Sequence, residues 1–185
     1  MSESRSPKPM EFVVRPMSED DWEPYRDIRL EMLRDTPMAY GETLESALSV
    51  DEAGWRKRAD ARSTPSRPYL PGSAVTSIRF AAILPDGTWI GSMGGYVDDR
   101  LGPVLVGVYV APSYRGDAFG VTTRLIEAVE AWASELAPTL HLDVHESNAR
   151  ARASYAKRGY VETGTTQPYP IDPRFVEIEM VKQIR

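Results

Sequence analysis

The stretch Val104–Ala133, VLVGVYVAPSYRGDAFGVTTRLIEAVEAWA, decides the fold of this chain. Its first part is a β-branched and aromatic run that stops at Ala111-Pro112, which predicts a buried strand over Val104–Val110. Its last part predicts an amphipathic helix, because apolar residues recur at three- and four-residue steps: Val121, Leu125, Ala128, Val129 and Trp132. The loop between them, Tyr114–Gly120, contains one arginine and two glycines.

This order of strand, loop and helix predicts a phosphate-binding site. Unpaired backbone N–H groups and the positive end of the helix dipole point at one place, where an anion is stabilised. Gly116 and Gly120 have no Cβ to block a ligand, and both can adopt a positive φ. The loop lacks Gly-Lys-Ser/Thr and Gly-x-Gly-x-x-Gly, which excludes a nucleotide P-loop and a dinucleotide fingerprint here. The alternative interpretation is connecting structure without a ligand.

A second segment strengthens the functional interpretation. Leu140–Val144 alternates apolar and polar residues, which predicts another strand. Asn148 is a good N-cap residue and Gly159 a good residue to follow a helix, so a helix is expected between them. Ala151 and Tyr155 are four residues apart and therefore share one face of that helix.

Together the two segments resemble the GCN5-related N-acetyltransferase (GNAT) family. The resemblance rests on the glycine-containing loop and on one spacing pattern, matched by Asn148, Ala151, Tyr155, Gly159 and Tyr160. Coarser similarity runs from about Phe12 to Val181. The resemblance implies an α+β fold in three layers, with a mixed, mostly antiparallel central sheet, splayed central strands and flanking helices.

The loop departs from the family pattern Arg/Gln-x-x-Gly-x-Gly/Ala. In one register Arg115, Ala118 and Gly120 occupy the three fixed positions, and in the other Gly120-Val121-Thr122 stands for Gly-x-Gly. Both registers keep Gly120 near the pyrophosphate of the ligand, and both place Asp117 in or beside the anion site.

The resemblance also implies the cosubstrate, acetyl-CoA, and the residues around it. The strand Val108–Val110 would bind pantetheine, and the backbone N–H of Val110 would polarise the thioester carbonyl as an oxyanion donor. Tyr155 would be the acid that protonates the leaving thiolate. The full set of expected cofactor-binding residues is Val108, Tyr109, Val110, Arg115, Gly116, Asp117, Ala118, Gly120, Val121, Thr122, Asn148, Ala151 and Tyr155. Gly94, in another predicted strand, is expected to tolerate substitution with little effect on cofactor binding.

The general base and the acceptor stay open. The central strand has no glutamate, so the candidates are His145, Glu146, Asp143 or a chain of water molecules. The resemblance implies that the acceptor is a primary amine of a small metabolite, an antibiotic, a polyamine or a protein terminus. A non-catalytic acyl-CoA-binding or interaction module on the same fold is the alternative from a different class, and thioester turnover separates the two.

Composition and the remaining patterns complete the expectations. The chain has 185 residues, a net charge of −5 and no cysteine, which favours one cytoplasmic domain over residues 11–185, without disulfides and without nucleic acid as a partner. Residues 1–10 are expected to be a disordered tail rather than a signal peptide, no membrane span is expected, and His141 and His145 alone make no metal site. A homodimer is plausible by analogy with the family.

The other expected elements are strands at 12–15, 77–84, 89–97, 161–166 and 175–184, helices at 22–34 and 49–61, and loops at 62–73, 98–103 and 168–173.

Overall fold

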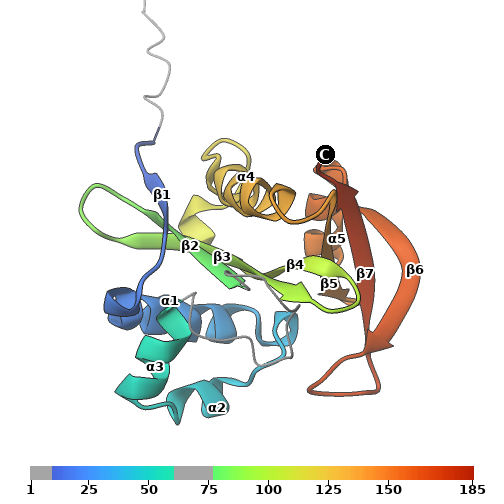
Figure 1. Ribbon diagram of the computed structural model, residues 1–185. Coiled ribbons are helices and arrows are strands. Elements are labelled where there is room, and N and C mark those ends of the chain that lie inside the picture. Colours follow the sequence, from blue (N-terminus) through green and yellow to red (C-terminus); the bar gives the residue numbers. More distant parts are fainter. Residues whose placement is uncertain (1–9, 61–76) are drawn as a thin grey trace, which may run out of the picture.

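The computed structural model describes residues 10–60 and 77–185. Within these residues, seven strands form one sheet in the order β1-β2-β3-β4-β5-β7-β6 (Figure 1). The strands are β1 (Val13–Pro16), β2 (Ser77–Ile83), β3 (Trp89–Asp98), β4 (Gly102–Val110), β5 (Thr139–His145), β6 (Val161–Pro168) and β7 (Val176–Gln183). The helices are α1 (Trp22–Asp35), α2 (Leu44–Leu48), α3 (Glu52–Ala59), α4 (Val121–Ser134) and α5 (Ala149–Lys157).

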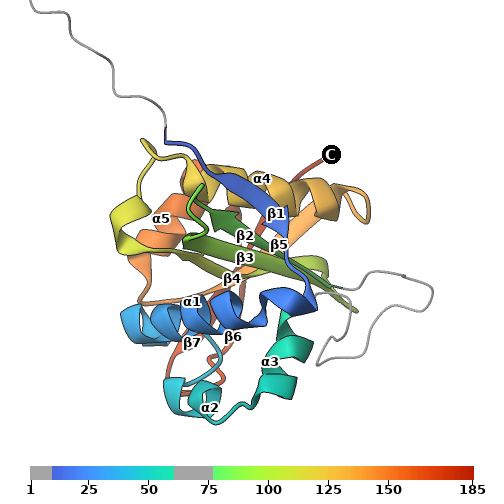
Figure 2. The ribbon, with the colours of Figure 1, turned by 90° about the vertical axis from the view of Figure 1, so that its left-hand side faces the viewer.

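The molecule has three layers, with the sheet in the middle. Helices α1 to α3 cover one face of the sheet, while α4 and α5 lie on the other (Figures 1 and 2). Successive side chains of β2 enter different cores, since Phe80 and Ala82 pack on the α4 side whereas Ala81 and Ile83 pack on the α1 side. Both faces of the sheet are therefore buried along much of its length, as expected for a central sheet between two helical layers.

The central strands β4 and β5 separate along their length. They form the parallel pair of the sheet, and the pairing covers Val104 with His141 and Leu105 with Leu142. Beyond these residues β4 continues to Val110 and β5 to His145 without pairing to each other. This geometry confirms the mixed, mostly antiparallel sheet with splayed central strands.

A bulge in β4 lies beside this separation. The register between β3 and β4 shifts from Gly94 opposite Val106 to Ser92 opposite Tyr109, so β4 has one residue more than β3 over this stretch. Gly107 lies in the bulge with a φ of 61°, a conformation that costs glycine nothing and other residues about 1–2 kcal/mol. The bulge turns the end of β4 away from the regular ladder, as bulges near active sites commonly do.

Two local expectations differ from the structure in their ends. The helix expected at 49–61 is α3, which is shorter because the Asp51 carboxylate caps it by accepting the Gly54 N–H. The short helix α2, which the Thr43 hydroxyl caps by accepting the Ser46 N–H, precedes it and was not expected. The connection expected at 98–103 is shorter, since β4 already begins at Gly102.

The strands and helices expected elsewhere are confirmed within a few residues, including the hairpin turn at Pro85–Thr88. The expected tail at 1–10 falls, except for its last residue, outside the described residues, and so does the loop expected at 62–73. Among the described residues, no helix combines the length and apolar character needed to cross a bilayer.

Candidate active site

A cleft of about 1150 Å³ opens where β4 and β5 separate. One side of it is formed by the ends of β4 and β5, the loop after β4 and helix α5. The other side is formed by α1, the segment after it, α2 and the faces of β2 and β3 that point toward these helices. The cleft therefore has a half beside α4 and α5, which the sequence predicts to bind the cofactor, and a second half under α1 to α3.

The loop and the first turn of α4 present backbone donors to the first half. Gly120 is the N-cap of α4 with a φ of 69°, and Gly116 has a φ of 104°. The helical hydrogen bonds begin with the Arg124 N–H, which donates to the Gly120 carbonyl. The N–H groups at the start of the helix therefore have no intrahelical acceptor and carry partial positive charge. This arrangement is suited to an anion.

The charged side chains of the loop form ion pairs with other residues of the protein. Asp117 pairs with Lys157 and, at 3.6 Å, with Arg158, so its charge is neutralised by α5. Arg115 donates to the Val110 carbonyl at 2.7 Å and pairs with Asp35 of α1. Arg115 thus links the loop to β4 and to α1, and in this arrangement its guanidinium has a structural role.

The unpaired edge of β4 carries backbone groups into the cleft. The Ala111 N–H donates to the Ile90 carbonyl of β3, and hydrogen-bonding directions alternate along an antiparallel pair. The Val110 N–H therefore points away from β3, toward the opening between β4 and β5. Two residues earlier, the Val108 carbonyl accepts a hydrogen bond from the Tyr40 hydroxyl at 3.1 Å.

Helix α5 places Tyr155 at the wall of the cleft. The Asn148 side chain caps the helix by accepting the Ala151 N–H at 3.2 Å, as the sequence predicts. Tyr155 is 9% exposed, packs edge-on against Tyr160, and its hydroxyl has no hydrogen-bond partner among the described residues. Burial raises the pKa of Tyr155, and its interaction with Tyr40 raises that pKa further, so the hydroxyl keeps its proton at neutral pH.

The structure separates the three base candidates. Glu146 is not part of the cleft lining, and its carboxylate accepts the Val176 N–H at 3.0 Å. His145 lines the cleft, but its Nδ1 accepts the Ser147 N–H, so the neutral ring presents a donor at Nε2. Asp143 lines the cleft on the same face of β5. Glu177 of β7, which the sequence analysis missed, also lines it.

Two tyrosines far from the expected motifs join the halves of the cleft. Tyr40 donates from its hydroxyl to Val108, and its backbone carbonyl accepts a hydrogen bond from the Tyr169 hydroxyl at 2.8 Å. Tyr169 in turn packs edge-on against His145 with ring centroids 4.7 Å apart. Burial raises the pKa of Tyr40 to about 12. No local pattern reveals these residues, because their partners lie 68 and 129 residues away in the sequence.

The α1 side of the cleft contains a cluster of Arg29, Glu42 and Arg58. The two guanidinium groups each approach Glu42 to 2.7 Å. Burial by itself favours the protonated form of Glu42, but the two arginines outweigh it and hold its pKa below the ordinary value. Glu42 is therefore ionised at neutral pH and engages both arginines. Within residues 10–60 and 77–185, no group of three metal-ligating side chains comes together.

Glu42→Gln is expected to lower the free energy of unfolding by about 1–3 kcal/mol at neutral pH, because both arginines lose their charged acceptor. A lowered carboxylate pKa contributes stability above its unfolded-state value and loses it as the pH falls through the folded-state value. The difference between wild type and variant should therefore begin to shrink as the pH falls below 4.5 and vanish below the lowered folded-state pKa of Glu42. Urea unfolding over a pH series measures this, with the exposed Glu45→Gln as control. A difference that persists in acid would contradict the charge-based explanation.

Comparisons with known proteins agree with this geometry. A family model described as the acetyltransferase (GNAT) family matches residues 30–160, more than half of the chain. A GNAT-family acetyltransferase from Streptococcus pneumoniae has a similar structure, with a TM-score of 0.72 at 18% identity over 95% of this chain and 100% of that chain. A GCN5-related N-acetyltransferase from Kribbella flavida gives 0.65 at 22% identity over 93% and 97%. PaiA N-acetyltransferase from Thermoplasma acidophilum, in complex with coenzyme A, gives 0.67 at 18% over 94% and 99%. No curated protein matches the chain.

Proposed function

The chain belongs to the acetyltransferase (GNAT) family, and we propose that it transfers an acetyl group from acetyl-CoA directly to a primary amine of a small molecule, a peptide or a protein. The observation that carries this proposal is the opening between β4 and β5, which lies beside the N-terminus of α4 and has Tyr155 on its wall. An extended ligand with an anionic group matches such an opening. The coenzyme A complex of the Thermoplasma acidophilum enzyme supports coenzyme A as that ligand.

In this proposal the pyrophosphate binds the N–H groups at the start of α4 and in the loop Arg115–Gly120. We favour the register with Arg115, Ala118 and Gly120 in the fixed positions, because Thr122 already belongs to the first turn of α4. Pantetheine lies along Val108–Val110 as an added strand, with α5 on its other side. The pairing of Asp117 with Lys157 and Arg158 removes the repulsion that a free carboxylate would exert on the pyrophosphate.

The transfer follows from the groups at the opening. The unprotonated amine nitrogen attacks the thioester carbonyl carbon, and the Val110 N–H stabilises the negative charge that develops on the carbonyl oxygen. The carbon–sulfur bond then breaks, Tyr155 protonates the leaving sulfur, and the nitrogen loses one proton to a base. We place that base at Asp143 or Glu177, directly or through water, since both line the cleft while Glu146 does not. The products are the N-acetyl compound and coenzyme A.

Acetyl-CoA is expected to raise the thermal stability of the protein. A ligand that binds only the folded state adds about 2.7 kcal/mol when it is present at a hundredfold excess over its Kd. ATP and NAD should stabilise far less, because neither carries the pantetheine arm that fits along β4. Differential scanning fluorimetry and calorimetry measure both effects. If millimolar acetyl-CoA neither binds nor stabilises the protein, the proposed cofactor site is wrong.

The alternative is an acyl-CoA-binding module without catalysis. It has in its favour that β4 carries no carboxylate and that the loop has alanine at a glycine position. Thiol release from acetyl-CoA in a broad amine panel decides between the two. Cofactor binding without any turnover would favour the module, whereas amine-dependent thiol release would establish the enzyme.

A further inference from the structure

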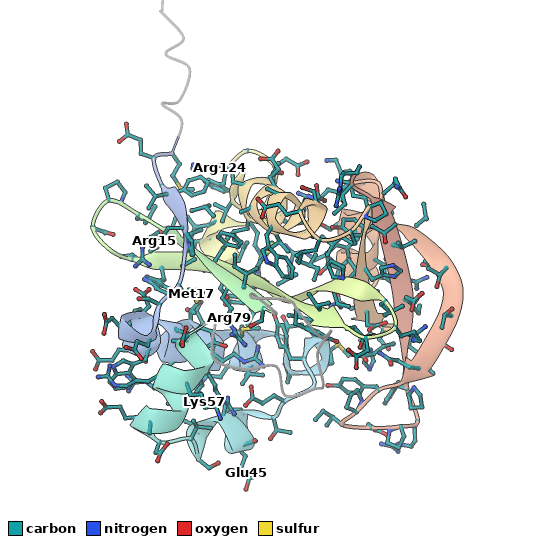
Figure 3. All side chains as sticks on the ribbon, viewed as in Figure 1. Arg15, Met17, Glu45, Lys57, Arg79 and Arg124 are labelled. Carbon is teal, nitrogen blue, oxygen red and sulfur yellow. The ribbon has the colours of Figure 1, made fainter. Side chains whose placement is uncertain are left out.

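We infer that the α1 side of the cleft binds the carboxylate of the acceptor, through Arg79, so that the acceptor is a small amine of the amino-acid class. This inference rests on the proposed function and names its substrate class. The argument starts from the position of Arg79 on β2. Its side chain extends into the space between the sheet and the layer of α1 to α3 (Figure 3), and it is part of the cleft lining.

A row of three residues, paired across the neighbouring strands β2, β3 and β4, connects Arg79 to the central strand. Arg79 lies opposite Gly94 of β3, and Gly94 lies opposite Val106 of β4. A Cβ on Gly94 would be only 3.2 Å from the Arg79 Cγ, so the arginine side chain runs across β3 where a side chain is missing. Val106 follows Leu105, the last residue of β4 that pairs with β5, and it is 38% exposed. The row therefore ends where the opening between β4 and β5 begins, four residues before Val110.

Among the described residues, the guanidinium of Arg79 has no anionic partner. Its Cζ lies 5.7 Å from the ring centroid of Tyr25, and no described carboxylate forms an ion pair with it. Residues 61–76, which precede β2, contain no aspartate or glutamate. The one carboxylate that lines this half of the cleft, among the described residues, is Glu42, and it engages Arg29 and Arg58. A half-buried guanidinium without a carboxylate partner among the described residues is a natural ligand for an incoming anion.

The charged groups that line the cleft bear on the choice of acceptor. Three arginines and one glutamate line the half under α1 to α3, and Asp143 and Glu177 line the face of β5 and β7. The other charged lining residues lie beside the loop and α5, where the pyrophosphate is proposed to bind: Arg115, Asp117, Arg150, Lys157 and Arg158. Strands β2 and β4 are two strand spacings, or roughly 10 Å, apart, and the arginine side chain covers part of that distance. A carboxylate on Arg79 thus limits the length of the chain between that carboxylate and an amine beside β4. A planar carboxylate can accept two parallel hydrogen bonds from the guanidinium. Polyamines lack any anion and should be poor acceptors.

The test compares α-, β- and γ-amino acids with their primary amides, using acetyl-CoA and thiol detection. Wild type should acetylate the better amino acids with a kcat/KM about 10- to 100-fold above that of the matching amide. Arg79→Gln should abolish this preference, because it lowers kcat/KM for the amino acids, mainly through KM, far more than it lowers kcat/KM for the amides. Arg79→Lys should restore part of the preference, since it restores the charge but not the two-pronged geometry.

Arg26→Gln is the matched control, because Arg26 also lies over an aromatic ring, that of Trp22, but does not line the cleft. It should keep the preference of the wild type. The inference is overturned if wild type acetylates acids and amides equally, or if Arg79→Gln slows both equally, which would indicate a structural role. Acetylation of amides or polyamines without preference leaves the proposed function standing. If nothing is acetylated, the proposed function fails. Calorimetry of amino acids with wild type and Arg79→Gln then still tests the inference, and amino-acid binding that is absent or equal in the two proteins overturns it.

Discussion

Tyr155→Phe is expected to lower kcat about 10²-fold, because it removes the acid that protonates the leaving sulfur. The ring stays in place, since Tyr155 is buried and packs against Tyr160 with centroids 5.8 Å apart. The free energy of unfolding should barely change, because the hydroxyl has no hydrogen-bond partner among the described residues. The Kd for acetyl-CoA should change by less than about tenfold, as one hydroxyl contact contributes roughly 1 kcal/mol. Steady-state kinetics with an accepted amine, together with calorimetry, measures all three quantities.

Tyr160→Phe is the matched control for this prediction. Tyr160 is buried beside Tyr155, but its hydroxyl donates to Glu130 at 3.2 Å and it does not line the cleft. Its loss should cost about 1 kcal/mol of stability and leave kcat unchanged. If Tyr155→Phe turns over the amine at the wild-type rate, then Tyr155 is a packing residue. The thiolate would then depart unprotonated or take its proton from water.

Gly120→Val is expected to weaken acetyl-CoA binding by about 1–3 kcal/mol, or roughly 5- to 150-fold. Gly120 has a φ of 69°, which a β-branched residue strongly disfavours, so the loop must change its conformation. That change moves the N–H groups at the start of α4 away from the pyrophosphate. An added Cβ would meet no protein atom within 4 Å, so the effect does not come from a clash in the core. Titration calorimetry of both proteins with acetyl-CoA measures the loss.

Gly87→Val serves as the control, because Gly87 has a φ of 90°, has no atom within 4 Å of an added Cβ, and lies in the β2–β3 turn outside the cleft lining. It should pay a similar backbone cost in stability and bind acetyl-CoA normally. Gly94, where the sequence predicts little effect of substitution on cofactor binding, is unsuitable as a control because a Cβ there would be 2.7 Å from the Ile78 carbonyl oxygen. Unchanged affinity in Gly120→Val would place the pyrophosphate elsewhere.

The sequence by itself determined the features that depend on neighbouring residues. Helix α4 buries Val121, Leu125 and Val129, as their spacing predicts, because side chains three and four residues apart share one helix face. Asn148 caps α5, and Gly159 follows the helix with a φ of 91°, because capping is settled within a few residues of the helix end. The same locality sets the start of the helix expected at 49–61, since the Asp51 carboxylate caps α3 and the helix begins at Glu52.

Only the tertiary structure decided how the cleft is built. The separation of β4 from β5, the hydrogen bond from Tyr40 to Val108 and the course of Arg79 across Gly94 all join segments distant in the sequence. None of these contacts leaves a periodic or compositional signal, because each depends on strand order and register rather than on neighbouring residues. The choice among the base candidates also depends on the tertiary structure, since the Glu146 carboxylate lies outside the cleft lining and accepts the Val176 N–H of β7. Local patterns identify the groups that can do chemistry, while the packing of the sheet between its helices decides which of them face one another.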